Sequence, residues 1–298
     1  MVNCEKLERE KIFLVTLFLF RNIYVKIVAP SPIVPTNMIF PFIKYQGTGN
    51  DFILFESSKI LEDFLTQAKI KELCDRHLGI GSDGLILLCK NAQYDFEMKF
   101  YNPDGKLTSL CGNGSRCAVH YAIERGIVKS KTVNFLASDG AHSAELIGPN
   151  IIRIKMKNVE KFNKGKRYFI FDTGSPHYIL FTRSEINTYK LINTAKKIRF
   201  SEKFKAKGIN VNIARIRKKG IEIRTYERGV EDETLSCGTG VVAVALASYL
   251  YSGSGDNVTV FTKGGELKVK FLFDEEKKFH EIFLEGAVVK IFEGKVEF

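Results

Sequence analysis

The chain has 298 residues, of which 45% are hydrophobic and 27% charged, a composition typical of a soluble globular protein with ample material for a core. The length suits two domains of ordinary size or one large domain. The formal net charge is +11, but the basic residues are scattered and no recognition motif accompanies them. We therefore expect a lysine-rich surface with neither a nucleic-acid nor a membrane partner.

The spacing of the six cysteines disfavours both a disulfide scaffold and a zinc site. No C-x-x-C pair occurs, and the separation of Cys111 from Cys117 is not a usual spacing for zinc ligands. We therefore expect free thiols in a reducing cytoplasm.

Residues 12–20 form a short apolar run, IFLVTLFLF. A helix that spans a bilayer needs roughly 20 apolar residues, and a signal peptide has a basic segment before its apolar run and a small-residue cleavage site after it. Neither pattern is present. A coherent strand–turn pattern begins at Met38, after three prolines, so we expect residues 1–37 to be an extension that is disordered or results from a non-native start.

The first elements are strands interrupted by one helix. Residues 39–45 are typical of a strand, which turns at the glycine-rich sequence GTGNDF and resumes at 53–56. Apolar residues at helical spacing predict one helix over 61–77. Two strands follow, at 85–89 and 96–101, and the second ends in the turn sequence NPDG.

Two similar helices follow, one in each half of the remaining chain. The first begins at or just after Cys111 in the sequence CGNG, continues through small and apolar residues, and ends at Gly126. The second begins in the same way at Cys237, in the sequence CGTG. The other apolar or alternating segments predict short strands, at 132–136, 142–146, 151–156, 168–172, 178–181, 209–215, 222–227, 257–261, 266–271, 282–284 and 288–291.

The two Cys-Gly-x-Gly segments form an internal repeat. Each follows a strand and a short polar loop, and each begins an apolar helix. A helix rich in small apolar residues on all faces is expected to be buried. We therefore predict an α/β (α+β) fold of two pseudo-symmetric halves, each with strands wrapped around one central helix.

A cysteine at a helix N-terminus is in a setting that favours the thiolate. Unpaired N–H groups and a partial positive charge there lower the pKa of a thiol and bind carboxylates, and a following glycine lets a ligand approach the backbone. If two such sites face each other, one thiolate can remove a proton beside a carboxylate while the other thiol protonates the opposite face. The pair Cys111 and Cys237 therefore indicates an enzyme that inverts a stereocentre of its substrate.

A structural role for the cysteines is the alternative. A single cysteine in such a segment is more often a buried core residue, since free cysteine is among the most buried residue types. The matched pair favours the functional interpretation. The other cysteines have no such context and are interpreted as structural, namely Cys4, Cys74, Cys89 and Cys117.

Seven segments, taken together and in this order, resemble the diaminopimelate epimerase family, although any one alone would be weak. The resemblance extends from about Met38 to the C-terminus. The segments are KYQGTGNDF (44–52), GIGSDG (79–84), YNPDG (101–105), CGNGSRC (111–117), GSPH (174–177), YERG (226–229) and CGTG (237–240).

The resemblance implies two strand-rich barrels, each around a central helix, with the active site in the cleft between them. The first half would comprise residues 38–155 plus 283–298, and the second residues 156–282. The implied reaction interconverts LL- and meso-2,6-diaminopimelate by a thiolate and thiol pair, in lysine and cell-wall precursor biosynthesis. It would use no metal, pyridoxal phosphate or other cofactor.

The resemblance also implies roles for individual residues. Among the catalytic residues, Cys111 would be paired with His177, and Cys237 with Glu227. The substrate would be held at its remote end by Asn50, Asn102, Asn210 and Arg228, and at its α-carboxylate by Gly112, Asn113, Gly238 and Thr239. Taken singly, the asparagines could be ordinary turn residues and Glu227 could form a surface ion pair with Arg228. As a set around two cysteines, they favour the functional interpretation.

Two departures from the family pattern concern substrate binding and the second thiol. Many members have asparagine where this chain has Ser175, so the amide that contacts substrate is absent here. The loop from Glu227 to Cys237 is one residue longer and contains three acidic residues, Glu231, Asp232 and Glu233. Their charges would disfavour a thiolate at Cys237 unless they point to solvent.

Two other functions stay open at this point. Proline and hydroxyproline racemases resemble the chain in having two active-site cysteines, but a small imino acid needs no polar contacts at a far end. A non-catalytic basic binding protein is supported only by the net charge of +11. The expected partner is a small-molecule substrate, and the sequence leaves open whether the chain forms a homodimer.

Overall fold

The computed structural model describes residues 38–108, 111–276 and 278–298. Within them the chain is a mixed α/β structure with many strands and few helices, as the sequence predicts. Residues Phe40–Val296 form one compact unit. At the two ends of the described chain, Met38 and Phe298 exchange two backbone hydrogen bonds, of 3.0 and 2.9 Å. The predicted extension, residues 1–37, lies outside the described residues.

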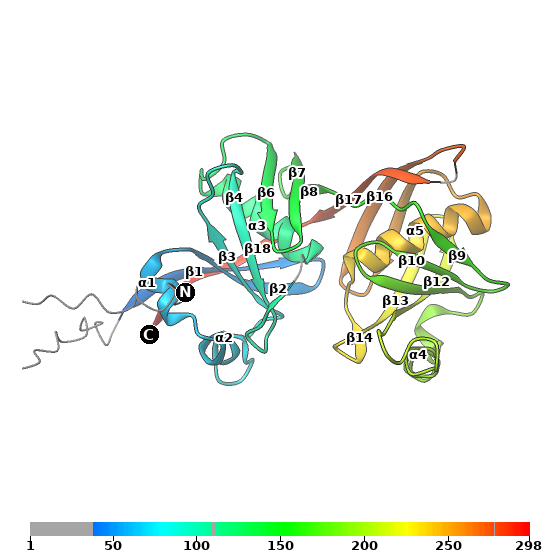
Figure 1. Ribbon diagram of the computed structural model, residues 1–298, viewed down its shortest axis with the longest axis horizontal. Coiled ribbons are helices and arrows are strands. Elements are labelled where there is room, and N and C mark those ends of the chain that lie inside the picture. The colour runs from blue at the N-terminus through cyan, green and yellow to red at the C-terminus, as the bar shows by residue number, and fades with distance from the viewer. Residues whose placement is uncertain (1–37, 109–110, 277) are drawn as a thin grey trace, which may run out of the picture. The chain divides into compact units, whose positions relative to one another are not determined.

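The N-terminal half is built from strands that surround one helix. Its strands are β1 (Ile39–Gly47), β2 (Asn50–Glu56), β3 (Leu85–Cys89), β4 (Phe96–Tyr101), β5 (Leu107–Thr108), β6 (Thr132–Ala137), β7 (Gly140–Gly148) and β8 (Ile151–Lys155). Helix α3 (Gly112–Glu124) contacts β2, β3, β4, β7 and β8 (Figure 1). Most of the helix is buried, because its small side chains let the strands approach it from several sides.

The C-terminal half repeats this plan. Its strands are β9 (Phe162–Lys164), β10 (Phe169–Asp172), β11 (Pro176–Phe181), β12 (Asn210–Arg217), β13 (Gly220–Glu227), β14 (Asp232–Thr234), β15 (Asn257–Thr262), β16 (Gly265–Phe273) and β17 (Phe279–Ala287). Helix α5 (Gly238–Ser252) contacts β10 to β13 and β15 to β17 (Figure 1). The prediction of a buried second helix is confirmed, since its alanine and valine side chains are buried on all faces.

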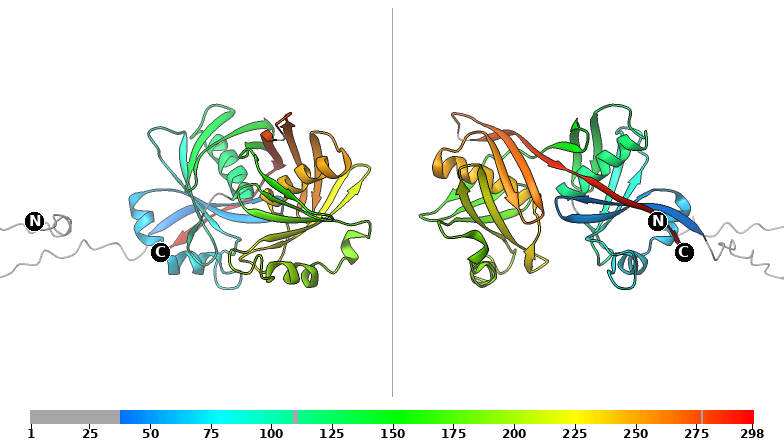
Figure 2. Two further views of the ribbon diagram at one scale, coloured as in Figure 1. Left: turned by 45° about the vertical axis from the view of Figure 1, so that its right-hand side comes forward. Right: turned by 180° about the vertical axis from the view of Figure 1, so that it is seen from behind.

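Strand β17 belongs to both halves. It pairs antiparallel with β16 and, from Phe283 to Ala287, with β8. The chain then continues into β18 (Val289–Glu297), which pairs with β1 and lies beside it in the view from behind (Figure 2). The last residues therefore return to strands of the N-terminal half. The half boundaries at 155/156 and 282/283 stay a prediction.

The single helix predicted over 61–77 is wrong in detail. The structure has two helices there, α1 (Lys59–Phe64) and α2 (Gln67–Cys74). Thr66 separates them, because its hydroxyl accepts a hydrogen bond of 3.3 Å from Lys69 N and so caps a new helix. Spacing of apolar residues alone did not distinguish this break.

Residues 186–199 contain helical structure that the sequence analysis did not predict. They form the short 3-10 helix η2 (Ile186–Thr188) and helix α4 (Leu191–Arg199). The exposed residues of α4 are Asn193, Lys196 and Lys197, while Leu191 and Ala195 are buried in a cluster with β12 residues. None of the helices in the described part of the chain has the length and hydrophobicity of a membrane-spanning segment.

Candidate functional site

Both predicted cysteine sites are N-caps of long buried helices. Cys111 has an extended backbone (φ −101°, ψ 112°), and its carbonyl accepts the first helical hydrogen bond from Ser115 N at 2.7 Å. Cys237 has nearly the same geometry (φ −130°, ψ 108°), with Val241 N at 2.9 Å from its carbonyl oxygen. The prediction that each helix begins directly after its cysteine is confirmed.

The two helix N-termini contact each other. A Cβ atom added to Gly238 would lie 3.9 Å from Gly112 Cα and 3.1 Å from the Cδ2 atom of Leu284 on β17. Asn113 Nδ2 also donates to Ser236 O at 3.5 Å. Glycine at both positions permits this approach, because neither residue has a side chain to fill the space. The structure therefore brings the two Cys-Gly segments together.

The pKa values of both thiols lie far above neutrality, because both side chains are buried. Burial raises the pKa of Cys111 to about 11, although N–H groups of Gly114 and Asn113 act in the opposite direction. Burial likewise raises the pKa of Cys237 to about 12. The expectation of a lowered thiol pKa is wrong for the protein without substrate, because desolvation outweighs the helix N-terminus.

His177 lies on β11 and is completely buried. Its Nδ1 is 3.1 Å from Asn212 Nδ2, and Asn212 Oδ1 accepts from Thr225 Oγ1 at 2.9 Å, so the amide donates to Nδ1. His177 Nε2 then carries the proton and donates to Thr239 Oγ1, 2.9 Å away. Thr239 Oγ1 in turn is 3.5 Å from Cys237 Sγ.

These contacts connect His177 to the second thiol. Within the described residues, no hydrogen bond joins His177 to Cys111, the pairing that the family resemblance implies. Burial lowers the pKa of His177 to about 3, with the positive charge of Arg228 acting in the same direction. The imidazole is therefore neutral at physiological pH and acts through hydrogen bonds.

Glu227 ends β13 and interacts with both cysteines. Burial raises the pKa of its carboxyl group, and the nearby Asp83 carboxylate acts in the same direction. Its own negative charge contributes to the raised pKa of Cys111 and of Cys237. The carboxyl group thus lies in electrostatic reach of both thiols.

Ser175 joins two of the predicted substrate-binding residues. Its hydroxyl accepts from Asn210 Nδ2 at 2.9 Å and from Arg228 Nη2 at 3.4 Å. Asn210 Oδ1 accepts from the backbone N–H of Arg228 at 2.8 Å. The serine that departs from the family pattern is therefore part of a polar cluster with Asn210 and Arg228.

Asn50 and Asn113 form a second polar cluster. Asn113 Nδ2 donates to Asn50 Oδ1, and Asn50 Nδ2 donates to Asp83 Oδ2 at 3.0 Å. Arg76 holds Asp83 and Asp51 at 2.7 Å each. The Asn50 amide is thereby fixed in orientation by charged neighbours, and its oxygen in turn accepts from the Asn113 amide.

Asn102 is not brought to either cluster. It is exposed in the turn after β4, where its backbone oxygen accepts from Gly105 N at 2.9 Å. Its side chain makes no hydrogen bond to the other predicted site residues among those described. In this structure Asn102 is an ordinary turn residue, which is the alternative that the sequence left open.

Two of the three acidic residues before Cys237 form ion pairs with cations. Glu231 pairs with Arg199 at 2.8 Å. Glu233 pairs with Arg224 at 2.6 Å and also with Lys263 at 2.9 Å. These ion pairs reduce the repulsion that the sequence predicted for a thiolate at Cys237.

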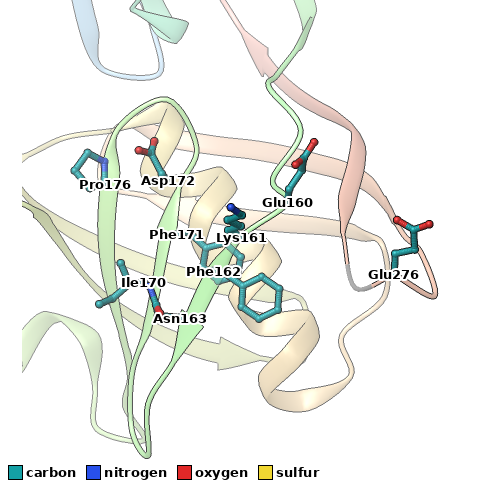
Figure 3. Close-up of a pocket in the computed structure, with 9 residues that line it drawn as sticks. All are labelled: Glu160, Lys161, Phe162, Asn163, Ile170, Phe171, Asp172, Pro176 and Glu276. Carbon is teal, nitrogen blue, oxygen red and sulfur yellow. The ribbon is translucent and has the colours of Figure 1, made fainter.

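A separate surface hollow of about 570 Å³ contains none of the predicted site residues (Figure 3). It is lined by Glu160, Lys161, Phe162, Asn163, Ile170, Phe171, Asp172, Pro176 and Glu276. In the part of the chain that the structure describes, no group of three or more His, Cys, Asp and Glu residues could hold a metal ion.

Sequence reasoning missed three residues that organise the site. Asn212 follows Asn210 by two positions on β12, so two polar side chains share one face of an otherwise apolar strand. That pattern could have indicated a role. Arg116 is a charged residue inside a buried helix, which could have done so as well. Asp83 had no signal besides its place in a glycine-rich loop.

Comparison with known proteins identifies relatives along most of the chain. A sequence profile described as "Diaminopimelate epimerase" matches residues 42–162 and 169–291. Proteins with this name from Flavobacterium psychrophilum and Aquifex aeolicus are 43% and 38% identical over 255 and 276 residues. The alignments cover 85% and 86% of this chain and 98% and 97% of the relatives.

Solved structures with the same fold are less similar in sequence. A PhzF-family phenazine biosynthesis protein from Bacillus anthracis has a TM-score of 0.66 and 13% identity, covering 87% of this chain and 99% of its own. A probable proline racemase from Agrobacterium radiobacter has a TM-score of 0.64 and 15% identity, covering 86% and 92%. These similarities show the fold, and with the double profile match they confirm the prediction of two repeated halves.

Proposed function

The chain belongs to the diaminopimelate epimerase family, and from this premise we propose that it interconverts LL- and meso-2,6-diaminopimelate with Cys111 and Cys237 as its acid–base pair. The observation that carries the proposal is the contact between two helix N-termini, each with a cysteine at its N-cap. A substrate carbon placed between them would have one sulfur on each face.

The reaction starts with one cysteine as thiolate and the other as thiol. The thiolate removes the proton from the substrate's α-carbon, and the electron pair of the broken C–H bond delocalises into the adjacent carboxylate. The opposite thiol then donates its proton to the other face of the carbon. The stereocentre is inverted, and the two cysteines have exchanged their protonation states.

The helix N-termini provide electrostatic stabilisation for this reaction. First-turn N–H groups at Gly112, Asn113, Gly238 and Thr239 would hold the α-carboxylate as its negative charge grows. The raised pKa of both thiols means that few thiolates exist without substrate. The α-ammonium group of the substrate would bring a positive charge to the site and favour ionisation of a thiol.

Glu227 and His177 support the second thiol in different ways. The raised pKa of Glu227 suits a general base that takes a proton from a neighbouring thiol. Neutral His177 orients the Thr239 hydroxyl, which lies 3.5 Å from Cys237 Sγ. This chain of hydrogen bonds would let Thr239 adjust as Cys237 gains or loses its proton.

The remote amino-acid head of the substrate would bind polar groups from both halves. The cluster of Asn210, Ser175 and Arg228 can accept an ammonium group and pair with a carboxylate. Asn50 would contribute its amide, and Asn102 would approach from its exposed turn. A proline-type substrate would leave this cluster without a partner, which disfavours the racemase alternative.

We expect the protein to work in the cytoplasm, where reduced thiols are maintained, in lysine and cell-wall precursor biosynthesis. Its proposed partner is the small-molecule substrate alone, without nucleic acid and without a cofactor. Association into a homodimer is compatible with this function but is not required by the chemistry described above.

The test is epimerisation of LL-diaminopimelate by the full chain in deuterated water without added cofactor. We expect α-proton exchange with formation of the meso isomer, and its loss in both Cys111→Ala and Cys237→Ala. Cys89→Ala is the matched control, because Cys89 and Cys237 are both 9% exposed but only Cys237 lies at a helix N-terminus. This control should retain activity.

L-Proline is the second substrate in the same experiment. Exchange on proline alone would move the chain to the racemase alternative. Absence of exchange on both substrates with reduced thiols would refute the substrate assignment.

A further inference from the structure

Arg116 is a charged side chain in the interior of the N-terminal half. It lies on α3, five residues after Cys111, and has no exposed surface. Its guanidinium donates to Thr48 Oγ1 at 2.6 Å, Asn113 Oδ1 at 2.9 Å and Gly112 O at 3.3 Å. All three acceptors are neutral, and all belong to the segments that form the candidate site.

No carboxylate pairs with Arg116 among residues 38–108, 111–276 and 278–298, and no acceptor there meets its Nε atom. Two other well-buried arginines of the chain do have such partners, Arg199 with Glu231 and Arg224 with Glu233. An unpaired charge in the interior destabilises the fold. An unpaired buried arginine at position 116 therefore needs an explanation other than stability.

Space is made for this charge by a glycine on β17. A Cβ atom added to Gly286 would lie 2.9 Å from Arg116 Nε and 3.0 Å from its Cζ atom. The guanidinium therefore packs directly against the strand shared by both halves. This packing confines it beside the N-terminal turn of α3.

The second half has no counterpart to this charge. The two helices begin with corresponding sequences, Cys111-Gly-Asn-Gly-Ser-Arg116 and Cys237-Gly-Thr-Gly-Val-Val242. The residue that corresponds to Arg116 is therefore Val242, a buried apolar side chain on α5. The repeat gives both thiols the same position at a helix N-terminus, but only the helix of Cys111 carries a buried arginine in its second turn.

We propose that Arg116 is a positioning residue for the epimerase reaction: it fixes the Asn113 amide and the Thr48 turn, and it places an uncompensated positive charge beside Cys111 but not beside Cys237. The inference rests on the proposed acid–base roles of the two cysteines. It assigns Cys111 as the thiol that ionises first.

The first part of this role is geometric. Arg116 binds Asn113 Oδ1, so Asn113 Nδ2 is directed toward Asn50 and Ser236 O. Thr48 has a positive φ of 55°, an uncommon conformation for a residue with a side chain, and its turn leads directly into Asn50. One guanidinium thus holds both amides of this cluster.

The second part of the role is electrostatic. Burial lowers the pKa of Arg116 to about 10, so it stays protonated at neutral pH. The charged side chains that act on Cys111 are Glu227 at the end of β13, which raises its pKa, and Arg116 on α3, which lowers it. Cys111 in turn raises the pKa of Cys117 on α3 and of Cys237 at the start of α5. Of these, Arg116 alone carries a positive charge, and Glu227 acts on both thiols.

The test is the rate of alkylation by iodoacetamide at neutral pH, where Arg116 is protonated, measured separately for Cys111 and Cys237 by peptide mass spectrometry on the full chain. In Arg116→Met and Arg116→Gln, we expect the alkylation rate of Cys111 to fall by about tenfold, because fewer thiolates form without the positive charge, while the rate of Cys237 stays the same. Arg116→Lys should keep the wild-type alkylation rate of Cys111. Activity should fall by about tenfold or more in the two neutral variants, with partial rescue in the lysine variant.

Arg224→Met is the matched control, since it removes a well-buried arginine that has a carboxylate partner. It should lower the melting temperature without changing the alkylation rate of Cys111. Arg116→Met should lower the melting temperature less than this control, because it removes an unpaired charge.

Equal alkylation rates of Cys111 in wild type and both neutral variants would overturn the inference, as would equal decreases in rate for both cysteines. A melting temperature that falls equally in the methionine, glutamine and lysine variants, without a change in the alkylation rate of either cysteine, would assign Arg116 a purely structural role. Alkylation needs no substrate, so failure of the diaminopimelate assay would be separate from failure of this inference.

Discussion

The electrostatic state of each titratable residue at the site is decided by burial. His177, Cys111 and Cys237 all favour their neutral forms, because the surroundings stabilise a charge less well than water does. Hydrogen bonds then determine what each neutral group does. The amide of Asn212 fixes the tautomer of His177, and through it the direction of the Thr239 hydroxyl.

Burial of neutral His177 makes stability depend on pH. Its pKa is lowered from 6.5 to about 3, so the unfolded chain binds a proton between these values that the folded chain does not. The stability contribution of the neutral imidazole is present above pH 6.5 and is lost as the pH falls toward 3. We expect His177→Gln to have a smaller decrease in the free energy of unfolding than wild type between pH 7 and pH 4.5, measured by urea denaturation. Parallel decreases in the two proteins would contradict this prediction.

The helices are placed by elements that leave room for close approach. Gly240, in the first turn of α5, is one such position, since a Cβ atom there would lie 2.8 Å from Asn212 Oδ1 and 3.2 Å from His177 Cε1. The small residues of α5 therefore do more than bury the helix. They allow the polar side chains of β11 and β12 to reach its N-terminus.

Gly240→Ala should disturb this contact between helix and strands. We expect a loss of about 1–3 kcal/mol in the free energy of unfolding, because neither Asn212 nor His177 can move away without losing a hydrogen bond. Activity should fall as well, since the contact to Thr239 depends on His177. Gly255→Ala is the control, because a Cβ atom there meets nothing within 4 Å. Chemical denaturation and epimerase assays of both variants decide the outcome.

At the scale of the whole molecule, β17 joins the two halves at the site itself. Leu284 on this strand is fully buried, and its side chain lies against both helix N-termini, at Gly112 and Gly238. The strand also carries Gly286, which packs against Arg116. The relative placement of the two cysteines therefore depends on one shared strand.

Leu284→Ala should remove the side chain that separates and supports the two helix N-termini. We expect the free energy of unfolding to fall by about 2–5 kcal/mol, as for other large-to-small core changes. Leu88→Ala on β3 should lower stability by a similar amount, since Leu88 is also buried. Only Leu284→Ala should in addition reduce kcat/KM beyond the loss of folded protein. Equal kcat/KM values per folded molecule in the two variants would contradict this prediction.

The sequence by itself determined the two halves, the two buried helices and the cysteines at their N-termini. These features have local causes: glycines after a cysteine start a helix, and a run of small apolar residues buries it. The break at Thr66 and helix α4 escaped prediction, because a side-chain cap and a lysine-rich exposed face obscure the periodicity.

Only the tertiary structure decided how the site works. It set the direction of the thiol pKa values, linked His177 to Cys237, joined Asn50 to Asn113 and placed Arg116 without a carboxylate partner among the described residues. Each of these depends on burial or on a contact between residues far apart in the chain. Local sequence patterns do not show which distant side chains exclude water from a group, place a charge beside it or form hydrogen bonds with it.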